Sequence, residues 1–290
     1  MKATEARLLD FLKRSQQFVI PIYQRTYSWT EQQCRQLWDD IIRAGKRDDI
    51  SAHFIGSVVY IEQGLYQVSG ISPLLVIDGQ QRLTTAMLLT EALSRHLGED
   101  EVFDGFSAMK LRNYYLLNPY ESGEKGFKLL LTETDKDSLL ALIKQRPMPE
   151  NYSHRIMENF TFFDEQIAKL GDDLIPLCRG LAKLLIVDVA LNRGQDNPQL
   201  IFESMNSTGK ALSQADLVRN FILMGLEPEH QTRLYEDHWR PMEVAFGQQG
   251  YSEYFDSFMR HYLTVKTGEI PISANLRVEP SEECDASVPR

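Results

Sequence analysis

Apolar and β-branched residues concentrate in three short segments that are typical of buried strands. HFIGSVVYIE at 53–62 and LLVID at 74–78 are separated by a loop with turn residues, and KLLIVDVAL follows at 183–191. We expect the first two segments to pair as neighbours. Directly after the second, Gly79 precedes residues 80–97, whose apolar positions recur at helical spacing. The pattern predicts a strand, a glycine turn and a helix in succession.

Helical spacing dominates most of the remaining chain. An apolar stripe predicts a short helix over Thr4–Arg14, which leads into FVIP at 18–21, where Pro21 stops regular structure, and an extended loop follows. The capping box of Thr30 and Gln33 predicts a helix that runs to about Gly45. Further helices are expected at 107–117, 135–145, 153–170, 173–180 and within 230–265, with a short strand near 127–132. The predicted fold class is therefore α/β (α+β), with a large helical remainder.

The composition is that of a globular protein. The chain has 290 residues, of which 43% are apolar and 25% charged, and this excludes disordered and fibrous classes. No apolar run approaches the roughly 20 residues of a membrane span, and the N-terminus lacks a secretory signal, so we expect a cytoplasmic protein without a membrane partner. Three widely spaced cysteines support neither a disulfide framework nor a zinc site.

The charge distribution limits where nucleic acid could bind. A net charge of -10 repels DNA unless basic groups gather on one face. Residues 1–30 hold five basic and two acidic residues, and the basic ones include Lys13, Arg14 and Arg25. Any DNA-binding surface is therefore expected to include this segment.

The segment LLVIDGQQRLTT at 74–85 is the most informative candidate site. A strand that feeds a helix N-terminus through a glycine makes an anion site from free backbone N–H groups, and phosphate is the expected ligand. Arg82 can bind phosphate oxygens, and the amides of Gln80 and Gln81 can donate to phosphate or orient a water. Asp78 could hold Mg²⁺ or polarise a nucleophilic water. The alternative is that Asp78 caps the helix and Arg82 forms a surface salt bridge.

Aromatic and polar residues alternate in a second segment, IPIYQRTYSW at 20–29. Tyr23, Tyr27 and Trp29 can stack on bases or sugars, while Gln24 and Arg25 can read polar edges or phosphates. The alternative is that the aromatic side chains belong to the core and that Arg25 is an ordinary surface charge.

A third segment, 191–220, places two polar loops on either side of a short amphipathic helix. Candidates to line a pocket are Arg193, Asp196, Asn206, Thr208, Lys210 and Arg219. Asn206 and Gly209 equally fit a helix C-cap, and Ser213 with Asp216 fits an N-cap. From these residues alone, caps are favoured.

Taken together, the motifs resemble one family, the N-terminal domain of GmrSD-type modification-dependent restriction endonucleases, which includes SspE-like phosphorothioate sensors. The resemblance rests on I-P-x-Y-Q-R-x-Y-x-W at 20–29, H-F-x-G-S-V at 53–58, I-D-G-Q-Q-R-L-T-T at 77–85 and F-E-x-M-N-x-x-G-x-x-L-S-x-x-D-L-V-R-N at 202–220. It spans roughly residues 5–262. It implies a ParB/sulfiredoxin-like core that binds and hydrolyses a nucleotide and senses modified DNA in antiviral defence.

The resemblance also implies roles for individual residues. It assigns nucleoside triphosphate hydrolysis, of GTP, UTP or ATP with Mg²⁺, to Asp78, Gln80, Gln81 and Arg82, with Asp78 as the metal ligand. Nucleotide contacts are expected from Gly79, Thr84, Tyr23, Gln24, Arg25, Asn206 and Lys210. Contacts to DNA are expected from Tyr23, Gln24, Arg25, Tyr27, Lys13 and Arg14.

The expected organisation follows from these motifs. A ParB-like core occupies 1–100, a helical insertion or subdomain 101–182, the completion of the core with C-terminal helices 183–265, and a tail or linker 266–290. The family's cutting activity usually lies in a C-terminal H-N-H domain, whose histidine pattern does not occur after residue 262. We therefore expect no DNA cleavage by this chain alone. Its expected partners are glucosylated or phosphorothioated DNA and an H-N-H nuclease domain in cis or in trans, and a homo-oligomer is compatible with this organisation.

Two other functions stay open from the sequence. The chain could be a non-enzymatic DNA- or protein-binding module in which D-G-Q-Q-R binds phosphate without hydrolysis. Alternatively, its ParB-like core could itself be a nuclease. Phosphate release with each nucleotide separates the first alternative from an NTPase, and incubation with modified and plain plasmid addresses the second.

Overall fold

The computed structural model describes residues 1–14, 17–62, 73–192, 195–206 and 213–270. The chain divides into two compact units, Met1–Met205 and Asn206–Arg290. Unit 1 contains a six-stranded mixed sheet and most of the helices, whereas the described part of unit 2 is helical. The mixed α/β class predicted from the sequence is confirmed.

The sheet of unit 1 has the strand order β1-β6-β3-β4-β2-β5. Its strands are β1 (Lys2–Arg7), β2 (Gln17–Val19), β3 (His53–Glu62), β4 (Pro73–Asp78), β5 (Leu129–Leu130) and β6 (Leu184–Leu191). β3 pairs antiparallel with β4, as expected, and parallel with β6. β2 lies parallel to both β4 and β5. The strand predictions at 53–62, 74–78 and 183–191 are therefore confirmed.

The helix expected over Thr4–Arg14 is wrong in its first half. Residues 2–7 form β1, which pairs antiparallel with β6, and the helix α1 begins only at Leu8 and ends at Lys13. The apolar stripe that predicted the helix lies in Leu8–Leu12, which is buried except at Asp10. Pairing with β6 overrides the helix propensity of the preceding alanines and charged residues.

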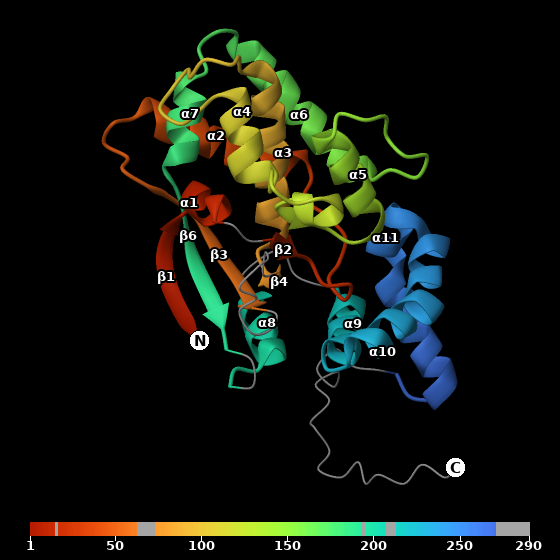
Figure 1. Ribbon diagram of the computed structural model, residues 1–290. Helices are drawn as coiled ribbons and strands as arrows, with labels where there is room; N and C mark the ends of the chain where they lie inside the picture. The colour runs from red at the N-terminus through yellow and green to blue at the C-terminus, as the bar shows by residue number, and fades with distance from the viewer. Residues whose placement is uncertain (15–16, 63–72, 193–194, 207–212, 271–290) are drawn as a thin grey trace. The chain divides into compact units, whose positions relative to one another are not determined.

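Helices cover the sheet and connect its strands (Figure 1). Unit 1 contains α2 (Glu31–Lys46), α3 (Gln80–His96), α4 (Ala108–Leu111), a π-helical turn (Arg112–Leu116), a 3₁₀ turn (Gly123–Gly126), α5 (Glu133–Ile143), α6 (His154–Leu170), α7 (Ile175–Ala182) and α8 (Pro198–Asn206). Unit 2 contains α9 (Gln214–Met224), α10 (Pro228–Leu234), a π-helical turn (Tyr235–Trp239) and α11 (Arg240–Thr267). None of the described helices is both long enough and apolar enough to cross a membrane.

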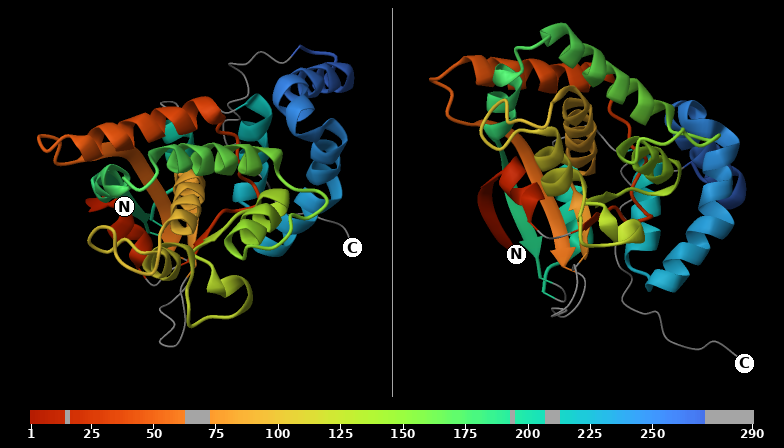
Figure 2. Two further views of the ribbon diagram at one scale, coloured as in Figure 1. Left: turned by 90° about the horizontal axis from the view of Figure 1, so that it is seen from above. Right: turned by 45° about the horizontal axis from the view of Figure 1, so that its top comes forward.

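The core of unit 1 lies between the sheet and its helices. Val58 and Val76 of the sheet are fully buried in one apolar cluster with residues of α1, α2, α3, α6 and α7, and seen from above these helices lie in front of the strands (Figure 2). The intervening residues Val59 and Ile77 are fully buried as well, so both faces of the central strands are covered. The central strands therefore form a rigid base for the loops at their ends.

Helix α3 is the central helix of this layer. Every residue from Leu83 to Ser94 is buried, as expected for a helix surrounded by other elements. Its one carboxylate, Glu91, is fully buried and forms ion pairs with Arg95 at 2.8 Å and Arg112 at 2.7 Å. The position of the N-terminus of α3 is thus set by packing along the whole helix.

Two glycines allow α2 and α7 to cross closely. A β-carbon at Gly45 would lie 1.7 Å from the carbonyl oxygen of Pro176, and one at Gly180 would lie 2.0 Å from that of Ile41. Both distances are far shorter than a van der Waals contact, so only glycine fits at either position.

Candidate nucleotide and recognition site

Strand direction brings three of the four sequence motifs to one edge of the sheet. β2 and β4 are parallel, so the loop 20–29 that follows β2 and the turn at Gly79 that follows β4 leave at the same edge. β3 runs antiparallel to β4, and Val59 pairs with Asp78. The residues of β3 before Val59 therefore lie beside the start of α3. This edge, with the carboxyl ends of parallel strands, is where α/β sheets place their ligands.

The turn at Gly79 requires glycine for two reasons. Its φ is +100°, in the left-handed region, and a β-carbon would lie 3.0 Å from Ser57 O and 3.1 Å from the α-carbon of Val58. Gly79 is also the N-cap residue of α3, and no side chain among the described residues caps this helix. The first N–H groups of α3 have no partner within the helix and are oriented to bind an anion.

Arg82 lies in the first turn of α3 and folds back over β3. Its Nη1 atom donates a hydrogen bond to the carbonyl oxygen of Ser57 and lies 3.5 Å from Oδ2 of Asp78. The side chains of Arg82 and Asp78 are 25% and 19% exposed. The alternative in which Asp78 caps α3 is not what the structure has, whereas the contact between Asp78 and Arg82 is present. Both groups keep an accessible part beside the uncapped helix N-terminus.

The two glutamines of D-G-Q-Q-R bind the loop 20–29. Gln80 Nε2 donates to the carbonyl oxygen of Arg25 at 2.9 Å. Gln81 Oε1 accepts from the N–H groups of Ser28 at 2.8 Å and Trp29 at 3.1 Å, and its Nε2 donates to Thr26 O at 3.4 Å. Both carboxamides are thus used within the protein.

Gln24 binds the other side of the same turn. The residue is 7% exposed, and its Nε2 atom donates to the carbonyl oxygens of Val76 at 2.6 Å and Ile77 at 2.8 Å, at the end of β4. Tyr23 is buried beside it, and burial raises the pKa of its hydroxyl well above the ordinary value. Of the recognition residues Tyr23, Gln24 and Arg25, only Arg25 is more than marginally exposed.

Tyr27 is the buried anchor of the loop. Thr85 donates its hydroxyl proton to Gln81 O, so the Tyr27 hydroxyl donates to Thr85 Oγ1 at 2.7 Å. Asn159 Nδ2 donates to the same hydroxyl at 3.0 Å. With no exposed surface, Tyr27 cannot contact DNA without a rearrangement, and the interpretation of its ring as part of the core fits its place.

A buried carboxylate holds the backbone of Tyr27. Asp135 Oδ2 accepts from the Tyr27 N–H at 2.5 Å, and burial raises the pKa of Asp135 to about 6. Asn159 Nδ2 also donates to the carbonyl oxygen of Trp29 at 2.7 Å. No sequence signal marked Asp135 or Asn159, because each acts on the loop from a distant helix.

The remaining predicted residues lie elsewhere or are used internally. Thr84 is fully buried, and its hydroxyl has no partner among the described residues. Lys13 Nζ lies 4.6 Å from the centre of the Tyr114 ring, and Arg14 forms a 2.6 Å ion pair with the buried Asp188. Lys210 lies outside the described residues, as does the side chain of Asn206.

The pocket considered for residues 191–220 stays a prediction, because Arg193, Thr208, Lys210 and the side chain of Asn206 lie outside the described residues. Asp196 forms a 2.7 Å ion pair with the N-terminal amine. In unit 2, Arg219 is fully enclosed and bound to Asp216 and Glu243. The capping role that the sequence favoured for Ser213 is confirmed, since its hydroxyl accepts from the Asp216 N–H at 3.0 Å.

A metal ion at the Asp78 edge would need ligands beyond the protein. Among the described residues, no group of three or more His, Cys, Asp or Glu side chains is placed to hold a metal. A Mg²⁺ ion that binds together with nucleotide phosphates takes only one or two protein carboxylates, because phosphate and water oxygens complete its shell. The single carboxylate of Asp78 fits that donor set.

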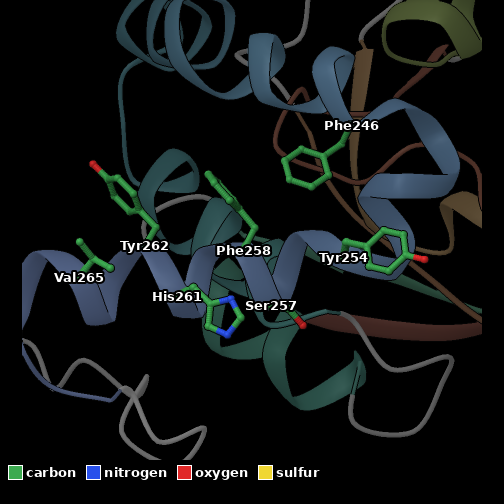
Figure 3. A pocket seen from close by; sticks show the side chains of 7 residues that line it. All are labelled: Phe246, Tyr254, Ser257, Phe258, His261, Tyr262 and Val265. Carbon is green, nitrogen blue, oxygen red and sulfur yellow. The ribbon is translucent and has the colours of Figure 1, made fainter.

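An apolar hollow lies on α11 in unit 2, away from these motifs in the sequence. Figure 3 shows Phe246, Tyr254, Phe258, Tyr262 and Val265 around it, with Ser257 and His261 on the same helix. Its lining is almost entirely apolar and carries no arginine or carboxylate. This surface does not resemble a phosphate site.

The fold and the edge at Gly79 define a mixed α/β protein in which a strand, a glycine turn and a helix place Asp78 and Arg82 at one edge of the sheet. Residues 8–223 match the family described as GmrSD restriction endonuclease, N-terminal domain, and the chain belongs to this family. The resemblance seen in the sequence is confirmed, and the chain has a role in a restriction system. No curated protein matches the chain.

Proposed function

We propose that this protein binds and hydrolyses a nucleoside triphosphate with Mg²⁺ and thereby serves as the sensor and regulator of a restriction system that acts on modified DNA. The observation that carries the proposal is the pairing of Arg82 and Asp78 at the N-terminus of α3, which no side chain in the described part of the chain caps. A cation, a carboxylate and free N–H groups at one point suit a phosphate chain better than any other common ligand.

In this proposal, Arg82 and Asp78 have different roles from Gln80 and Gln81. Arg82 and the first N–H groups of α3 bind phosphate oxygens, and Gly79 lets the phosphate approach the backbone. Asp78 holds Mg²⁺, which when bound neutralises phosphate charge, or orients the water that attacks. The carboxamides of Gln80 and Gln81, which the sequence suggested for phosphate or water, hold the loop 20–29 instead.

Recognition of modified DNA is assigned to the loop 20–29, with Arg25 as its accessible cation. Tyr23, Gln24 and Tyr27 are buried and shape the loop rather than reach outward. Binding of plain, glucosylated and phosphorothioated duplexes by fluorescence anisotropy tests this assignment, with Arg25→Gln as the variant. Equal affinity of both proteins for all three duplexes contradicts it.

The nucleotide proposal is tested by phosphate release with GTP, UTP and ATP in the presence of Mg²⁺. Arg82→Ala removes a charge-assisted contact and is expected to weaken nucleotide binding by roughly ten- to hundred-fold. Asp78→Asn is expected to retain much of the binding and lose hydrolysis. Arg43→Ala is the matched control, since Arg43 forms an ion pair with Asp40 on the exposed face of α2.

Each alternative has its own outcome in this experiment. Nucleotide affinity without phosphate release identifies a non-enzymatic binding module, and metal-dependent cutting of plasmid by the homogeneous chain identifies a nuclease. If Arg82→Ala unfolds the protein while Asp78→Asn hydrolyses nucleotide normally, the motif is structural and the proposal fails.

A further inference from the structure

We propose that Gln24, Gln80 and Gln81 couple the nucleotide site to the recognition loop by holding that loop across the strand–helix junction at Gly79. The inference rests on the proposed function and adds how the nucleotide site is regulated. Nucleotide bound at α3 sets the conformation of residues 24–29. In return, a ligand bound to that loop changes the affinity of the protein for nucleotide. The three glutamines are positioning residues in this account.

The junction is held from both sides by one loop. On the strand side, Gln24 donates to the last carbonyl groups of β4, those of Val76 and Ile77. On the helix side, Gln80 and Gln81 bind the backbone of the same loop. Gly79, with its left-handed backbone, lies between the two attachments. A change in the angle between β4 and α3 therefore cannot occur without moving or straining the loop.

Among the described residues, Gln81 makes more hydrogen bonds in these attachments than Gln24 or Gln80 does. Its carboxamide accepts from two consecutive N–H groups, those of Ser28 and Trp29, and donates to the carbonyl oxygen of Thr26. It thus fixes both N–H and C=O groups of the loop backbone through a single side chain. The main-chain N–H of Gln81 is in the first turn of α3, where the anion binds in the proposed function. An anion and the loop therefore share one residue.

Tyr27 lies inside the stretch that Gln81 holds, between Thr26 and Ser28, and anchors that stretch to α3 through Thr85. Tyr27 is fully buried and bound through its hydroxyl and its N–H to Thr85, Asn159 and Asp135. Arg25 lies between Gln24 and this anchor and is part-exposed. Because Gln24 is bound to β4 and residues 26–29 are bound to α3, a shift of α3 relative to β4 acts on Arg25, which lies between the two attachments.

The matched control is Gln17, which has the same chemistry in another place. Gln17 is 6% exposed and donates through Nε2 to two carbonyl oxygens, those of Glu124 at 2.7 Å and Phe127 at 3.0 Å. It therefore resembles Gln24 in burial and bonding, but it does not contact the Gly79 junction. Gln17→Met and Gln24→Met remove equivalent hydrogen bonds with little change in side-chain volume.

The test is hydrogen exchange of the amides of residues 24–29, followed by mass spectrometry with and without nucleotide. The probe is the non-hydrolysable analogue of whichever nucleotide gives the fastest phosphate release, with Mg²⁺, at a concentration that saturates each variant in its own titration. Nucleotide is expected to slow exchange at Ser28 and Trp29 by about fivefold or more in the wild type and in Gln17→Met. In Gln81→Met and Gln24→Met this response is expected to fall to less than about half.

A binding experiment gives the reciprocal measurement. Phosphorothioated duplex, if it binds the loop, should change nucleotide affinity in the wild type and in Gln17→Met by the same factor by which nucleotide changes DNA affinity. That factor should approach one in Gln81→Met. Hydrogen exchange and binding can each be measured on whichever of the Gln24→Met and Gln81→Met proteins folds, so the coupling is still tested if one of them does not fold.

The outcomes separate this inference from the proposed function. If the wild type binds nucleotide but exchange in 24–29 does not respond, or if Gln81→Met responds like the wild type, the coupling is wrong and the nucleotide site stands. If Gln81→Met loses nucleotide binding altogether, Gln81 contacts the nucleotide and is not a positioning residue. If the wild type binds no nucleotide, the proposed function fails and the coupling fails with it.

Discussion

The guanidinium of Arg82 occupies the space that a side chain at Gly56 would need. A β-carbon at residue 56 would lie 2.7 Å from Arg82 Nε and 2.8 Å from Arg82 Cζ, and the φ of Gly56 is +110°. Gly56 and its neighbour Ser57, whose carbonyl oxygen accepts from Arg82, thus form the surface on which this side chain rests. The H-F-x-G-S-V motif is therefore part of the same site as D-G-Q-Q-R.

Gly56→Ala is expected to displace Arg82 and to lower both stability and nucleotide affinity. The left-handed backbone alone costs on the order of 1–3 kcal/mol with a non-glycine residue. Gly105→Ala is the control, because Gly105 has a φ of +78° and nothing within 4 Å of its β-carbon position. Thermal unfolding should shift in both variants, but nucleotide affinity only in Gly56→Ala. Unchanged affinity in Gly56→Ala would show that the position of Arg82 does not matter.

Asp135 is expected to make stability depend on pH. Burial raises its pKa from 3.8 to about 6, so the folded chain holds this proton more tightly than the unfolded chain. The protonated Asp135 side chain therefore contributes fully to the free energy of unfolding below about pH 4. This contribution is lost as the pH rises through about 6, which lowers the free energy of unfolding by up to ~3 kcal/mol at pH 7.

Asp135→Asn should remove this dependence, since the amide oxygen can still accept from the Tyr27 N–H. Urea unfolding between pH 4 and pH 7 should show the variant gaining stability relative to the wild type as the pH rises. Asp137→Asn, at an exposed position on the same helix, is the control and should track the wild type. A constant difference between Asp135→Asn and the wild type would contradict the raised pKa.

Arg14 is expected to act on stability through Asp188. Asp188 is 4% exposed, so removal of Arg14 leaves a buried carboxylate without its cation. The coupling free energy should be roughly 1–2 kcal/mol, below that of a fully buried pair because Arg14 is 43% exposed. A double-mutant cycle of Arg14→Gln and Asp188→Asn measures it. Charge reversal at Arg14 is consequently a poor probe of DNA binding, and Lys13→Glu is the better one.

Gly180→Ala is expected to disrupt the crossing of α2 and α7. The new methyl group would lie 2.0 Å from the carbonyl oxygen of Ile41, so the helices must separate. We expect a loss of ~3 kcal/mol or more, at the upper end of overpacking effects. Gly98→Ala, with nothing within 4 Å, should leave the midpoint of urea unfolding nearly unchanged. A Gly180→Ala protein as stable as the wild type would refute the close crossing.

The elements that the sequence predicted well are those that depend on residues close to one another along the chain. The capping box of Thr30 and Gln33 is present, with Gln33 Oε1 accepting from the Thr30 N–H at 2.8 Å. The strand, glycine turn and helix at 74–97 also match, because β-branched residues and helical spacing adjoin a glycine that needs positive φ. Each of these features is decided by residues a few positions apart.

What the sequence could not predict depends on distant partners. Lys2–Arg7 is a strand only because β6 lies beside it. The glutamine amides of D-G-Q-Q-R look like ligand groups in isolation, yet their partners are backbone groups more than 50 residues away. Asp135 and Asn159 hold the loop from α5 and α6, and nothing in their surroundings along the chain sets them apart.

The pairing of β1 with β6 also bears on how the chain folds in the cell. Lys2 pairs with Ala190 and Arg7 with Leu185, so β1 has no partner in the sheet until the chain beyond residue 191 has emerged from the ribosome. Such non-local pairing is slow to form. β6 also separates β1 from β3, which leaves the edge of β3 open during synthesis. Nascent chains that stall before residue 191 should therefore be the ones that chaperones hold and that aggregate through that edge.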